Sequence, residues 1–337
     1  MKAREGDYAY AYGVVSGMTA KLIDDKTFDE LARFRSVEEV VAFLEGTDYE
    51  PEIKKVVGKT IEIENLESAL KRHFVRIYRS IVSSIPESDR KDLNRIISES
   101  LKVENLKIIM RGIHSGMEPE KIEEMLDIME DEELITELTK AKSVEEFIAG
   151  LEKTEYHDVL ESKLPEYREL GNLLPLENSL DKHMIDSWRG VVSKDLRRFV
   201  EIKTDTINIR TILRCKISDI PSKDYIIEEG HLKDKLSEME RGEVKDVLEI
   251  LDRTTYGKAA KEAMSEYEKT HSLISFEKRL ESDILTFLKE NAILRPLGVF
   301  SVMSFINAKR REVKNLNTVV ICKHYDVPPE EIKEILM

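Results

Sequence analysis

The sequence contains few residues that interrupt helices or cross-link a chain. Its 337 residues include 14 glycines, 9 prolines, 2 cysteines and one tryptophan. Two cysteines provide no disulfide framework, which fits a reducing compartment. So few glycines and prolines, in a chain rich in Glu, Lys, Leu and Ile, favour helix almost throughout. We therefore expect an all-α protein.

Long apolar runs are also absent. A membrane-spanning helix needs about 20 consecutive apolar residues. The most suggestive stretch, residues 297–306, is about half that length and contains serines and a glycine. The first five residues are followed by no apolar segment, so we expect no signal peptide. Any association with a membrane would then be peripheral.

Positive charge is in deficit. The 53 Lys and Arg residues stand against 67 Asp and Glu residues, which gives a formal net charge of −14. Nucleic-acid binding rewards a clustered basic surface, so we expect no nucleic-acid partner. An acidic surface instead suits a protein that binds other proteins.

The titratable residues form no recognisable catalytic or metal-binding pattern. None of the seven histidines pairs with another at a spacing of three or four, and no H-E-x-x-H motif occurs. Cys215 and Cys322 occupy equivalent places in two copies of a repeated helix, which predicts small core residues. The glutamates are too numerous for any one carboxylate pair to stand out. We predict no catalytic residue, no metal and no cofactor.

One helical segment is present in three copies. Residues 143–156 (SVEEFIAGLEKTEY) match residues 36–49 (SVEEVVAFLEGTDY) and, more loosely, residues 243–256 (EVKDVLEILDRTTY). Apolar residues recur at i, i+3, i+4 and i+7 in each copy, which is one face of a helix. The Ser-x-x-Glu that opens the first two copies predicts capping boxes at Ser36 and Ser143. The Thr-x-Tyr that closes every copy predicts a helix end and a ring that packs back.

Two further elements repeat with similar spacing. A Leu-Glu motif at residue 66 returns at 176 and, as Phe-Glu, at 276, and predicts long helices reaching past residue 80, past residue 195 and to about residue 290. Asn105, Asn208 and Asn315 mark another helix. Prolines at 119, 221 and 329 follow these asparagines, and each predicts a new helix, because proline is tolerated in a first helical turn.

The order of these elements predicts three helical units. A unit of about 100 residues can hold its own core. We assign lobes to residues 1–100, 101–204 and 205–337, and the third also contains a C-terminal helix pair that begins a further repeat. Three equal units suggest a pseudo-threefold body of helical-bundle lobes. Whether the lobes close into a ring or stack in a line stays open.

Four side chains are candidates for contact with a partner. Arg111 and Arg214 each stand six residues after a repeat asparagine, near the expected end of the helix. The alternative interpretation is a cation that stabilises the C-terminal end of the helix dipole. Tyr8 and Tyr12 belong to an aromatic cluster with Tyr10, and their alternate spacing does not fit one helix face. At least one of these rings is expected to face a partner.

The C-terminal sixth of the chain resembles a known family. Residues 297–299 (LGV), 305–306 (FI) and 309–316 (KRREVKNL) resemble the closing motif of the C subunit of archaeal A-type and bacterial V/A-type ATP synthases, a relative of the d subunit of the vacuolar ATPase. The aromatic first helix, the chain length and the threefold pattern extend this resemblance over essentially the whole chain. Asn317 and Met18 depart from the family pattern, in which basic residues are commoner at both places.

The resemblance implies an all-α, three-lobed, funnel-like rotor subunit without an active site of its own. Such a subunit links the central stalk to the membrane ring of proteolipid subunits and transmits torque in a proton- or sodium-translocating enzyme. It would lie peripherally on the cytoplasmic side of the cell membrane, as a monomer within the complex. Two other hypotheses stay open. One is a soluble helical scaffold that binds peptides away from membranes, and the other is a helical enzyme without a recognisable motif.

Overall fold

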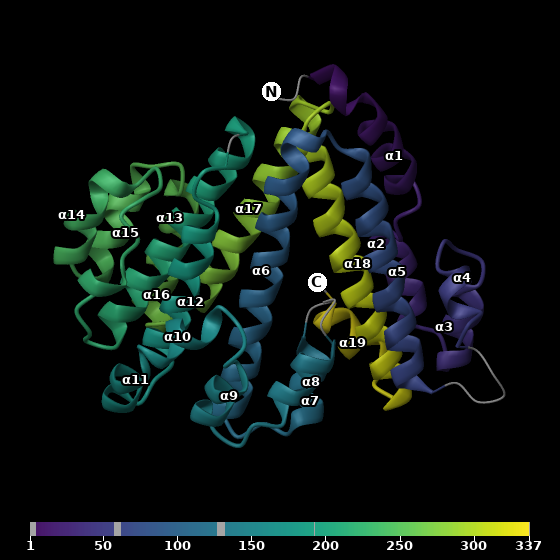
Figure 1. The fold of residues 1–337 in the computed structure, drawn as a ribbon, viewed down its shortest axis with the longest axis horizontal. Coiled ribbons are helices and arrows are strands. Elements are labelled where there is room, and N and C mark those ends of the chain that lie inside the picture. Colours follow the sequence, from purple (N-terminus) through teal and green to yellow (C-terminus); the bar gives the residue numbers. More distant parts are fainter. Residues whose placement is uncertain (1–4, 57–61, 127–131, 192, 337) are drawn as a thin grey trace. The chain divides into compact units, whose positions relative to one another are not determined.

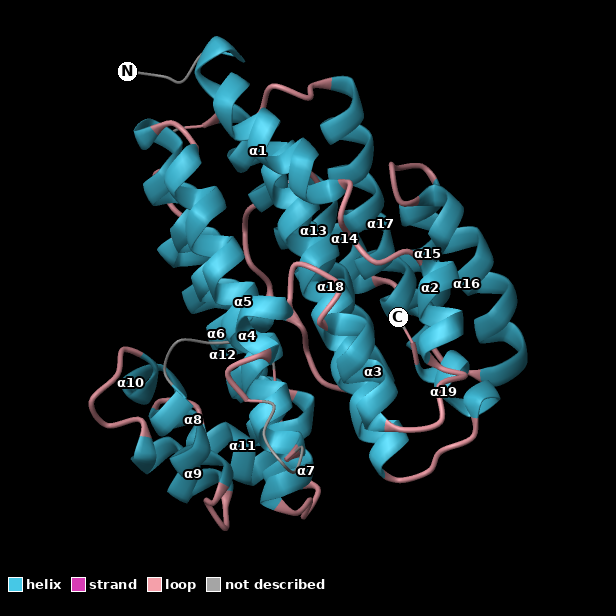
Figure 2. Cartoon of the chain, turned by 90° about the vertical axis from the view of Figure 1, so that its right-hand side faces the viewer, coloured by secondary structure: helices cyan, strands magenta, loops and turns pink. Residues whose placement is uncertain are grey.

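A computed structural model describes residues 5–56, 62–126, 132–191 and 193–336. Within these ranges the regular structure is entirely helical, with no strand, so the all-α prediction is confirmed (Figures 1 and 2). Among the helices in these ranges, none combines the length and the apolar character of a membrane-spanning segment.

The chain divides into two compact units, and each is described by itself. Unit 1 combines Met1–Arg90 with Leu288–Met337, and unit 2 comprises Lys91–Phe287. The boundaries fall within two long helices, α6 (Glu87–His114) and α17 (Ile274–Leu294). Unit 2 contains the second and third copies of the repeated segment, whereas unit 1 contains the first copy and the C-terminal helix pair. The division into three lobes stays a prediction.

Unit 1 is built from helices at both ends of the chain (Figure 1). Besides its parts of α6 and α17, its helical elements are η1 (Glu5–Tyr8), α1 (Ala9–Thr19), α2 (Asp25–Leu31), α3 (Val37–Leu44), α4 (Glu50–Ile53), α5 (Ile63–Ser84), α18 (Val299–His324) and α19 (Pro329–Ile335). The C-terminal helix α18 packs against α1, α3 and α5. Lys323 near the end of α18 donates a 2.5 Å hydrogen bond to the carbonyl of Ala32. The long helix of the C-terminal pair, α18, therefore packs with the N-terminal helices.

Unit 2 is a single stretch of the sequence, and its described residues are mainly helical. Besides its parts of α6 and α17, its helical elements are α7 (Pro119–Met125), α8 (Glu132–Thr139), α9 (Val144–Gly150), α10 (Tyr156–Glu161), α11 (Leu164–Leu170), α12 (Leu174–Ser187), α13 (Lys194–Ile217), η2 (Lys223–Tyr225), η3 (Lys233–Lys235), α14 (Leu236–Arg241), α15 (Val244–Asp252) and α16 (Gly257–Thr270). The third repeat has an apolar core between α13, α14, α15, α16 and α17. Cys215 of α13 is buried, as is Cys322 of α18 in unit 1, which confirms both as core residues.

The three copies of the repeated segment form α3, α9 and α15. All twelve positions of the predicted apolar face are buried: Val37, Val40, Val41, Leu44, Val144, Phe147, Ile148, Leu151, Val244, Val247, Leu248 and Leu251. Four apolar residues in one stripe give each short helix a face for its core, and tertiary packing of that face stabilises a helix of only two turns.

The Thr-x-Tyr turn has the same hydrogen bonds in all three copies. The threonine Oγ1 donates to the carbonyl of the leucine three residues earlier at 2.6–2.8 Å, which closes the last helical turn. The same oxygen accepts the tyrosine N–H at 3.1–3.3 Å. The tyrosine rings at 49, 156 and 256 are buried. The predicted helix end and docked ring are confirmed.

The predicted capping boxes are only partly correct. Ser143 accepts the N–H of Glu146 at 3.1 Å, but the Glu146 carboxylate accepts from Lys142, one residue before the cap. The side chain of Ser36 makes no capping bond. The complete box is in the third copy, where Glu243 and Asp246 cap each other's backbone N–H groups. A carboxylate oxygen can accept a backbone N–H as a serine oxygen does. The third box was not predicted because its first residue is a glutamate, whereas the Ser-x-x-Glu pattern requires a serine.

Two predicted helices differ from the structure. The helix that opens at the second Leu-Glu motif ends at Ser187 and does not pass residue 195. The chain turns at Gly190, whose φ of +84° lies in the left-handed region that a helix cannot continue, and α13 begins at Lys194. After Pro221 the chain forms a single 3-10 turn, Lys223–Tyr225, instead of the α-helix that follows Pro119 and Pro329.

Candidate functional site

The two predicted contact arginines lie in a row of alternating charges across four helices of unit 2. Arg111 of α6 donates two hydrogen bonds, of 2.5 and 2.8 Å, to the carboxylate of Glu177 on α12. Arg214 of α13 donates to Glu177 at 3.3 Å and to Glu277 of α17 at 2.8 Å. Two guanidinium groups and two carboxylates therefore alternate along the row.

A second row lies one helical turn away, on the same four helices. Lys107 Nζ is 2.5 Å from Asp181, Arg210 is 3.7 Å from Asp181, and Arg210 is 3.5 Å from Glu281. Each residue stands four positions from a first-row residue, so it points to the same side of its helix. We call the two rows together the charge ladder.

The charge ladder is buried at its centre and open at its edges. The side chains of Lys107 and Asp181 are 9% and 8% exposed, whereas that of Glu281 is 59% exposed. Burial alone would raise the pKa of Asp181, but Lys107 and Arg210 outweigh this effect and lower it. For Glu177 the hydrogen bonds and charge of Arg111 likewise outweigh burial and lower the pKa. Both central carboxylates are therefore ionised at neutral pH.

The alternative interpretation of Arg111 and Arg214 was an interaction with the helix dipole. Both instead make direct hydrogen bonds to carboxylates on neighbouring helices. Their side chains are 47% and 36% exposed, so each guanidinium also keeps a solvent-facing part. Sequence reasoning did not find Glu177 and Glu277, although both stand at the second position of the repeated Leu-Glu motif, as Glu67 does. The contact with a partner stays a prediction for Arg111 and Arg214.

In unit 1 the equivalent helices carry different residues. Asn317 of α18 stands where α6 has Lys107 and α13 has Arg210, and its side-chain amide donates to Glu67 of α5 at 3.3 Å. The position equivalent to Asp181 is Lys71. The lysine there replaces the carboxylate that Lys107 and Arg210 contact in unit 2. Asn317 thus accompanies a change of sign at position 71 on the neighbouring helix α5.

The tyrosines at 8, 10 and 12, where η1 meets α1, differ in burial. The Tyr8 ring is buried and its hydroxyl donates to Asp89 at 2.6 Å. Tyr10 is 72% exposed and Tyr12 is 40% exposed, so both rings reach the surface of this chain. No charged residue occurs in α1. The role of Tyr8 and Tyr12 in partner contact stays a prediction.

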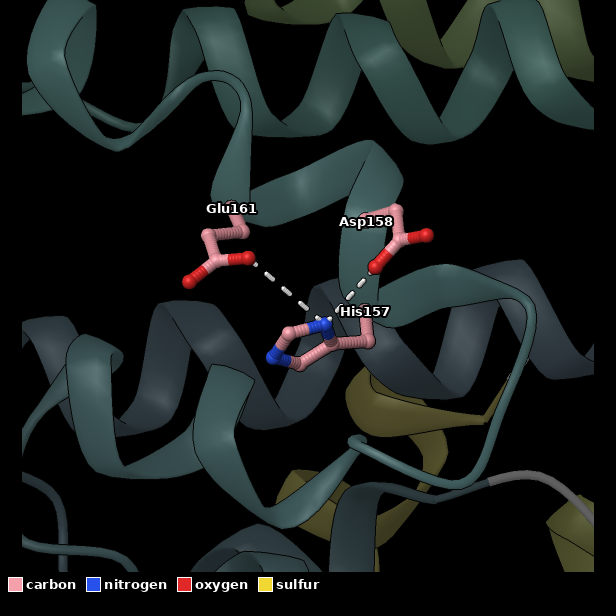
Figure 3. Close-up of side chains that lie close together, drawn as sticks. All are labelled: His157, Asp158 and Glu161. Carbon is pink, nitrogen blue, oxygen red and sulfur yellow. Dashed lines mark hydrogen bonds and ion pairs between the residues drawn. The ribbon is translucent and has the colours of Figure 1, made fainter.

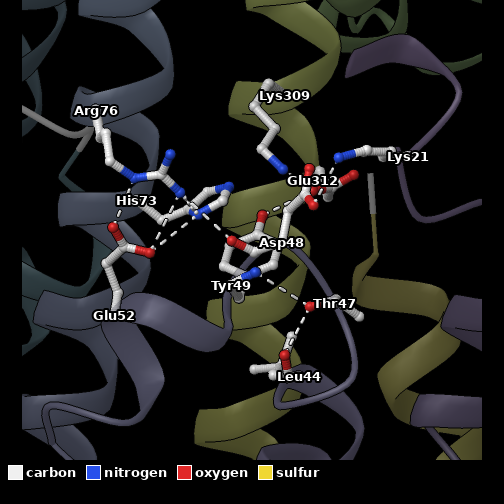
Figure 4. Close-up of polar contacts among 10 residues, drawn as sticks. All are labelled: Lys21, Leu44, Thr47, Asp48, Tyr49, Glu52, His73, Arg76, Lys309 and Glu312. Atoms are coloured by element: carbon white, nitrogen blue, oxygen red, sulfur yellow. Dashed lines mark hydrogen bonds and ion pairs between the residues drawn. The ribbon is translucent and has the colours of Figure 1, made fainter. Parts of the chain in front are cut away.

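Unit 1 contains a buried polar network that joins the two ends of the chain (Figure 4). Glu312 of α18 accepts hydrogen bonds from the Tyr49 hydroxyl at 2.7 Å, from Lys309 Nζ at 2.6 Å and from the backbone N–H of Ile23 at 2.7 Å. Burial disfavours the Lys309 ammonium and lowers its pKa, although Glu312 opposes this shift. The carboxylate satisfies two buried donors, on Tyr49 and Lys309, and the part-buried N–H of Ile23.

His73 of α5 occupies the other side of Tyr49 (Figure 4). The two rings stack with centroids 3.9 Å apart, and His73 Nδ1 lies 3.4 Å from Glu52. Arg76 donates to Glu52 at 2.7 Å. Burial, with the nearby Lys309 and Arg76 cations, lowers the pKa of His73 to about 4. A neutral, fully buried imidazole has no access to a substrate, so we assign this network to structure.

One group of side chains has the composition of a metal site. The side chains of His157, Asp158 and Glu161, all on α10, lie close together (Figure 3). His157 Nδ1 lies 3.0 Å from Asp158 and 3.8 Å from Glu161. The two carboxylates are 97% and 62% exposed, so water already solvates them and a cation would gain little. These contacts fit a surface ion pair that raises the pKa of His157, chiefly through its hydrogen bond with Asp158.

Comparison with known proteins decides the family. The family model described as ATP synthase (C/AC39) subunit matches residues 11–335. The chain belongs to this family. It is 31% identical to the C subunit of the A-type ATP synthase of Methanocaldococcus jannaschii, over 98% of this chain and 86% of that protein. The C subunit of the A-type ATP synthase of Methanothermobacter thermautotrophicus is also 31% identical, over 98% of this chain and 87% of its own length.

A relative of lower sequence identity also matches almost the whole chain. The C subunit of the A-type ATP synthase of Haloferax volcanii is 28% identical over 97% of both chains. The resemblance expected from the C-terminal motif is therefore confirmed over almost the whole sequence.

Proposed function

We propose that this C/AC39 chain is a subunit of a rotary ATP synthase that links the central stalk to the membrane proteolipid ring and transmits torque. Membership of the family is the observation that carries this proposal, and the relatives named as C subunits of A-type ATP synthases support it. The protein has no active site of its own. It lies peripherally on the cytoplasmic side of the cell membrane, as a monomer within a complex that moves protons or sodium ions.

The charge ladder supports a mechanical role. A helix that slides along its neighbour by one turn moves about 5.4 Å. Such a shift would separate Glu177 from Arg111 and Arg214 while leaving all three partly buried. Leaving a buried charge without its partner costs several kcal/mol, so the ladder resists sliding of α12 against α6 and α13. A subunit that passes torque between two partners needs this stiffness.

The three Thr-x-Tyr turns support the proposed lobes. We propose that residues 1–100, 101–204 and 205–337 form three pseudo-threefold lobes of a funnel-like body, with the C-terminal helix pair beginning a further repeat. The same threonine and tyrosine bonds in every copy are what duplication of one module would leave. An experimental structure in which the three modules cannot be superimposed would contradict this proposal.

Arg111, Arg214, Tyr8 and Tyr12 are the proposed contact residues. The two arginines present partly exposed guanidinium groups, which suit an acidic or polar partner surface. Tyr12 offers an exposed ring on a helix without charges. The proposal for Tyr8 rests on its place beside this helix, since its hydroxyl is already bonded to Asp89.

A binding experiment tests the proposed function. The purified chain is immobilised and incubated with the purified central-stalk subunits, and we expect the stalk to be retained. The double variant R111Q/R214Q should retain less stalk at unchanged helicity. The control is R197Q, because Arg197 is an exposed arginine on the same helix as Arg214. A folded wild-type chain that retains no stalk subunits would contradict the proposal.

A further inference from the structure

In two of the three repeats, one carboxylate accepts hydrogen bonds both from the buried tyrosine of the Thr-x-Tyr turn and from a backbone N–H just before a short helix. Asp205, three residues before Asn208, accepts from the Tyr256 hydroxyl at 3.1 Å and from the backbone N–H of Leu232 at 3.0 Å. Glu312, three residues before Asn315, makes the corresponding bonds to Tyr49 and Ile23, as described above. Each carboxylate fixes the backbone just before a short helical element, η3 after Leu232 and α2 after Ile23.

The second repeat has a lysine at this position. Lys102 stands three residues before Asn105, and an ammonium group cannot accept a hydrogen bond. The docked Tyr156 donates instead to Glu99, one turn earlier on α6, at 2.7 Å. Lys102 Nζ lies 3.4 Å from the same carboxylate. Position 102 therefore makes no bond of the kind that Asp205 and Glu312 make.

A pocket of about 160 Å³ opens beside Lys102. Its other walls come from α6, α8 and the Thr-x-Tyr turn and are mostly apolar: Leu106, Leu134, Ile135, Leu138, Leu151 and Tyr156, with Thr154 and Glu155 as the polar members. For comparison of size, a wholly apolar cavity of about 150 Å³ holds one benzene molecule. The pocket is thus large enough for one apolar side chain.

The surroundings of the pocket are acidic. Glu155 is part of the wall and its side chain is 55% exposed. Glu137 and Glu152 are also exposed, and each is adjacent in sequence to a leucine of the wall. The charge of Lys102 is balanced by Glu99. Nearly all of the excess negative charge of the chain lies in unit 2.

We propose that this pocket receives one apolar side chain of a partner segment in which lysine or arginine residues flank that side chain. The apolar walls provide the affinity for the inserted group, and the carboxylates select basic neighbours. The proposal goes beyond the proposed function, because it does not depend on which protein supplies the segment.

The test uses a synthetic peptide as probe: an alanine-based helix that presents one leucine between lysines. Its affinity for the full chain is measured by titration calorimetry. We expect the affinity to fall at least about tenfold when the leucine of the peptide becomes asparagine, because the pocket would bury an amide without a partner. Replacing the lysines of the peptide by glutamates should abolish binding.

Variants of the chain locate the site. L134W places a large ring in the pocket and should weaken binding at least about tenfold. I135F is a second filling variant, used if L134W loses helicity. E155Q should weaken binding about threefold. Its control E169Q changes an exposed glutamate of α11 and should leave the affinity unchanged.

Several results would overturn the proposal. If L134W and I135F bind the peptide as the wild type does, the lysines are attracted to the acidic surface in general. Absence of binding by the folded wild type contradicts the proposal directly. Self-association of the chain that L134W abolishes would show that a second copy fills the pocket instead.

Discussion

The hydroxyl of Tyr49 donates a 2.7 Å hydrogen bond to the carboxylate of Glu312, a residue 263 positions later in the chain. Tyr49 ends the first copy of the repeated segment, and Glu312 lies on the last long helix. In the other copies the docked tyrosine bonds to the long helix that precedes it, through Glu99 or Asp205. The first module is therefore completed by the C-terminal part of the chain.

Removing this bond should destabilise unit 1. In Y49F the Glu312 carboxylate loses one of three donors, and we expect a loss of about 1–2 kcal/mol in the free energy of unfolding. Urea denaturation followed by circular dichroism measures it. A double-mutant cycle with E312Q isolates the coupling. Additive effects of the two substitutions would show that the bond contributes nothing.

Acid should weaken the native state through His73. Its pKa falls from 6.5 to about 4 on folding. Between these values the unfolded chain binds more protons than the native chain, so the free energy of unfolding decreases as the pH is lowered from 6.5 to 4. One pKa unit corresponds to about 1.4 kcal/mol, so the full effect is about 3 kcal/mol. Below pH 4 His73 is protonated in the native chain too, and the stability that its neutral form contributes at higher pH is fully lost.

The variant H73Q isolates that contribution. It should have a flatter dependence of unfolding free energy on pH between 4 and 6.5 than the wild type, whatever its stability at neutral pH. Thermal or urea unfolding at several pH values gives the comparison. Parallel curves for the two proteins would show that His73 titrates alike in the folded and unfolded chains.

Neutralising Glu177 should damage the charge ladder. E177Q leaves Arg111 and Arg214 without their shared carboxylate, and because both arginines are partly exposed we expect a loss of about 2 kcal/mol. The matched control is E281Q at the exposed edge, which should cost no more than about 0.5 kcal/mol. Urea denaturation compares them. Equal losses would mean that burial does not strengthen the first row.

The glycine after the third Thr-x-Tyr turn should resist substitution. A Cβ on Gly257 would lie 2.4 Å from the backbone oxygen of Asp252, so G257A should destabilise the chain by about 2 kcal/mol. Gly17 is the control. It lies on the exposed side of α1 with nothing near its Cβ position, and G17A should stabilise the helix by about 0.5–1 kcal/mol. Melting temperatures that move in the same direction would contradict this interpretation.

The two thiols should be unreactive in the native chain. Cys215 is fully buried, and burial raises the pKa of its thiol to about 11. Burial also raises the pKa of Cys322. Because the thiolate is the reactive form, we expect neither cysteine to react quickly with a disulfide reagent at neutral pH, and both to react in denaturant. Rapid native labelling would contradict the packing of α13 or α18.

Features set by neighbouring residues could be predicted from the sequence. The i, i+3, i+4, i+7 pattern identified all twelve buried positions of α3, α9 and α15, and the Thr-x-Tyr motif identified their ends. Both are local, because helix periodicity and a threonine bond to the leucine three residues earlier need no distant partner. The C-terminal motif identified the family for the same reason, since order and spacing are sequence properties.

Features that depend on distant partners could not be predicted. The choice of Glu177 for Arg111 was hidden because glutamates are abundant and only packing brings α12 beside α6. The bond between Tyr49 and Glu312 has no local signature at all. The end of α12 at Ser187 was missed for a different reason: Gly190 is a local stop signal, but the apolar residues beyond Ser187 favoured a longer helix.

Ion pumping by the assembled enzyme tests the central claim most directly. The complex is reconstituted into sealed vesicles with and without this protein, and ATP hydrolysis and ion uptake are measured together. We predict that without it hydrolysis by the catalytic head continues while ion uptake is lost, and that added wild-type chain restores uptake. Full ion uptake in vesicles that lack this protein would contradict its role as the link between stalk and ring.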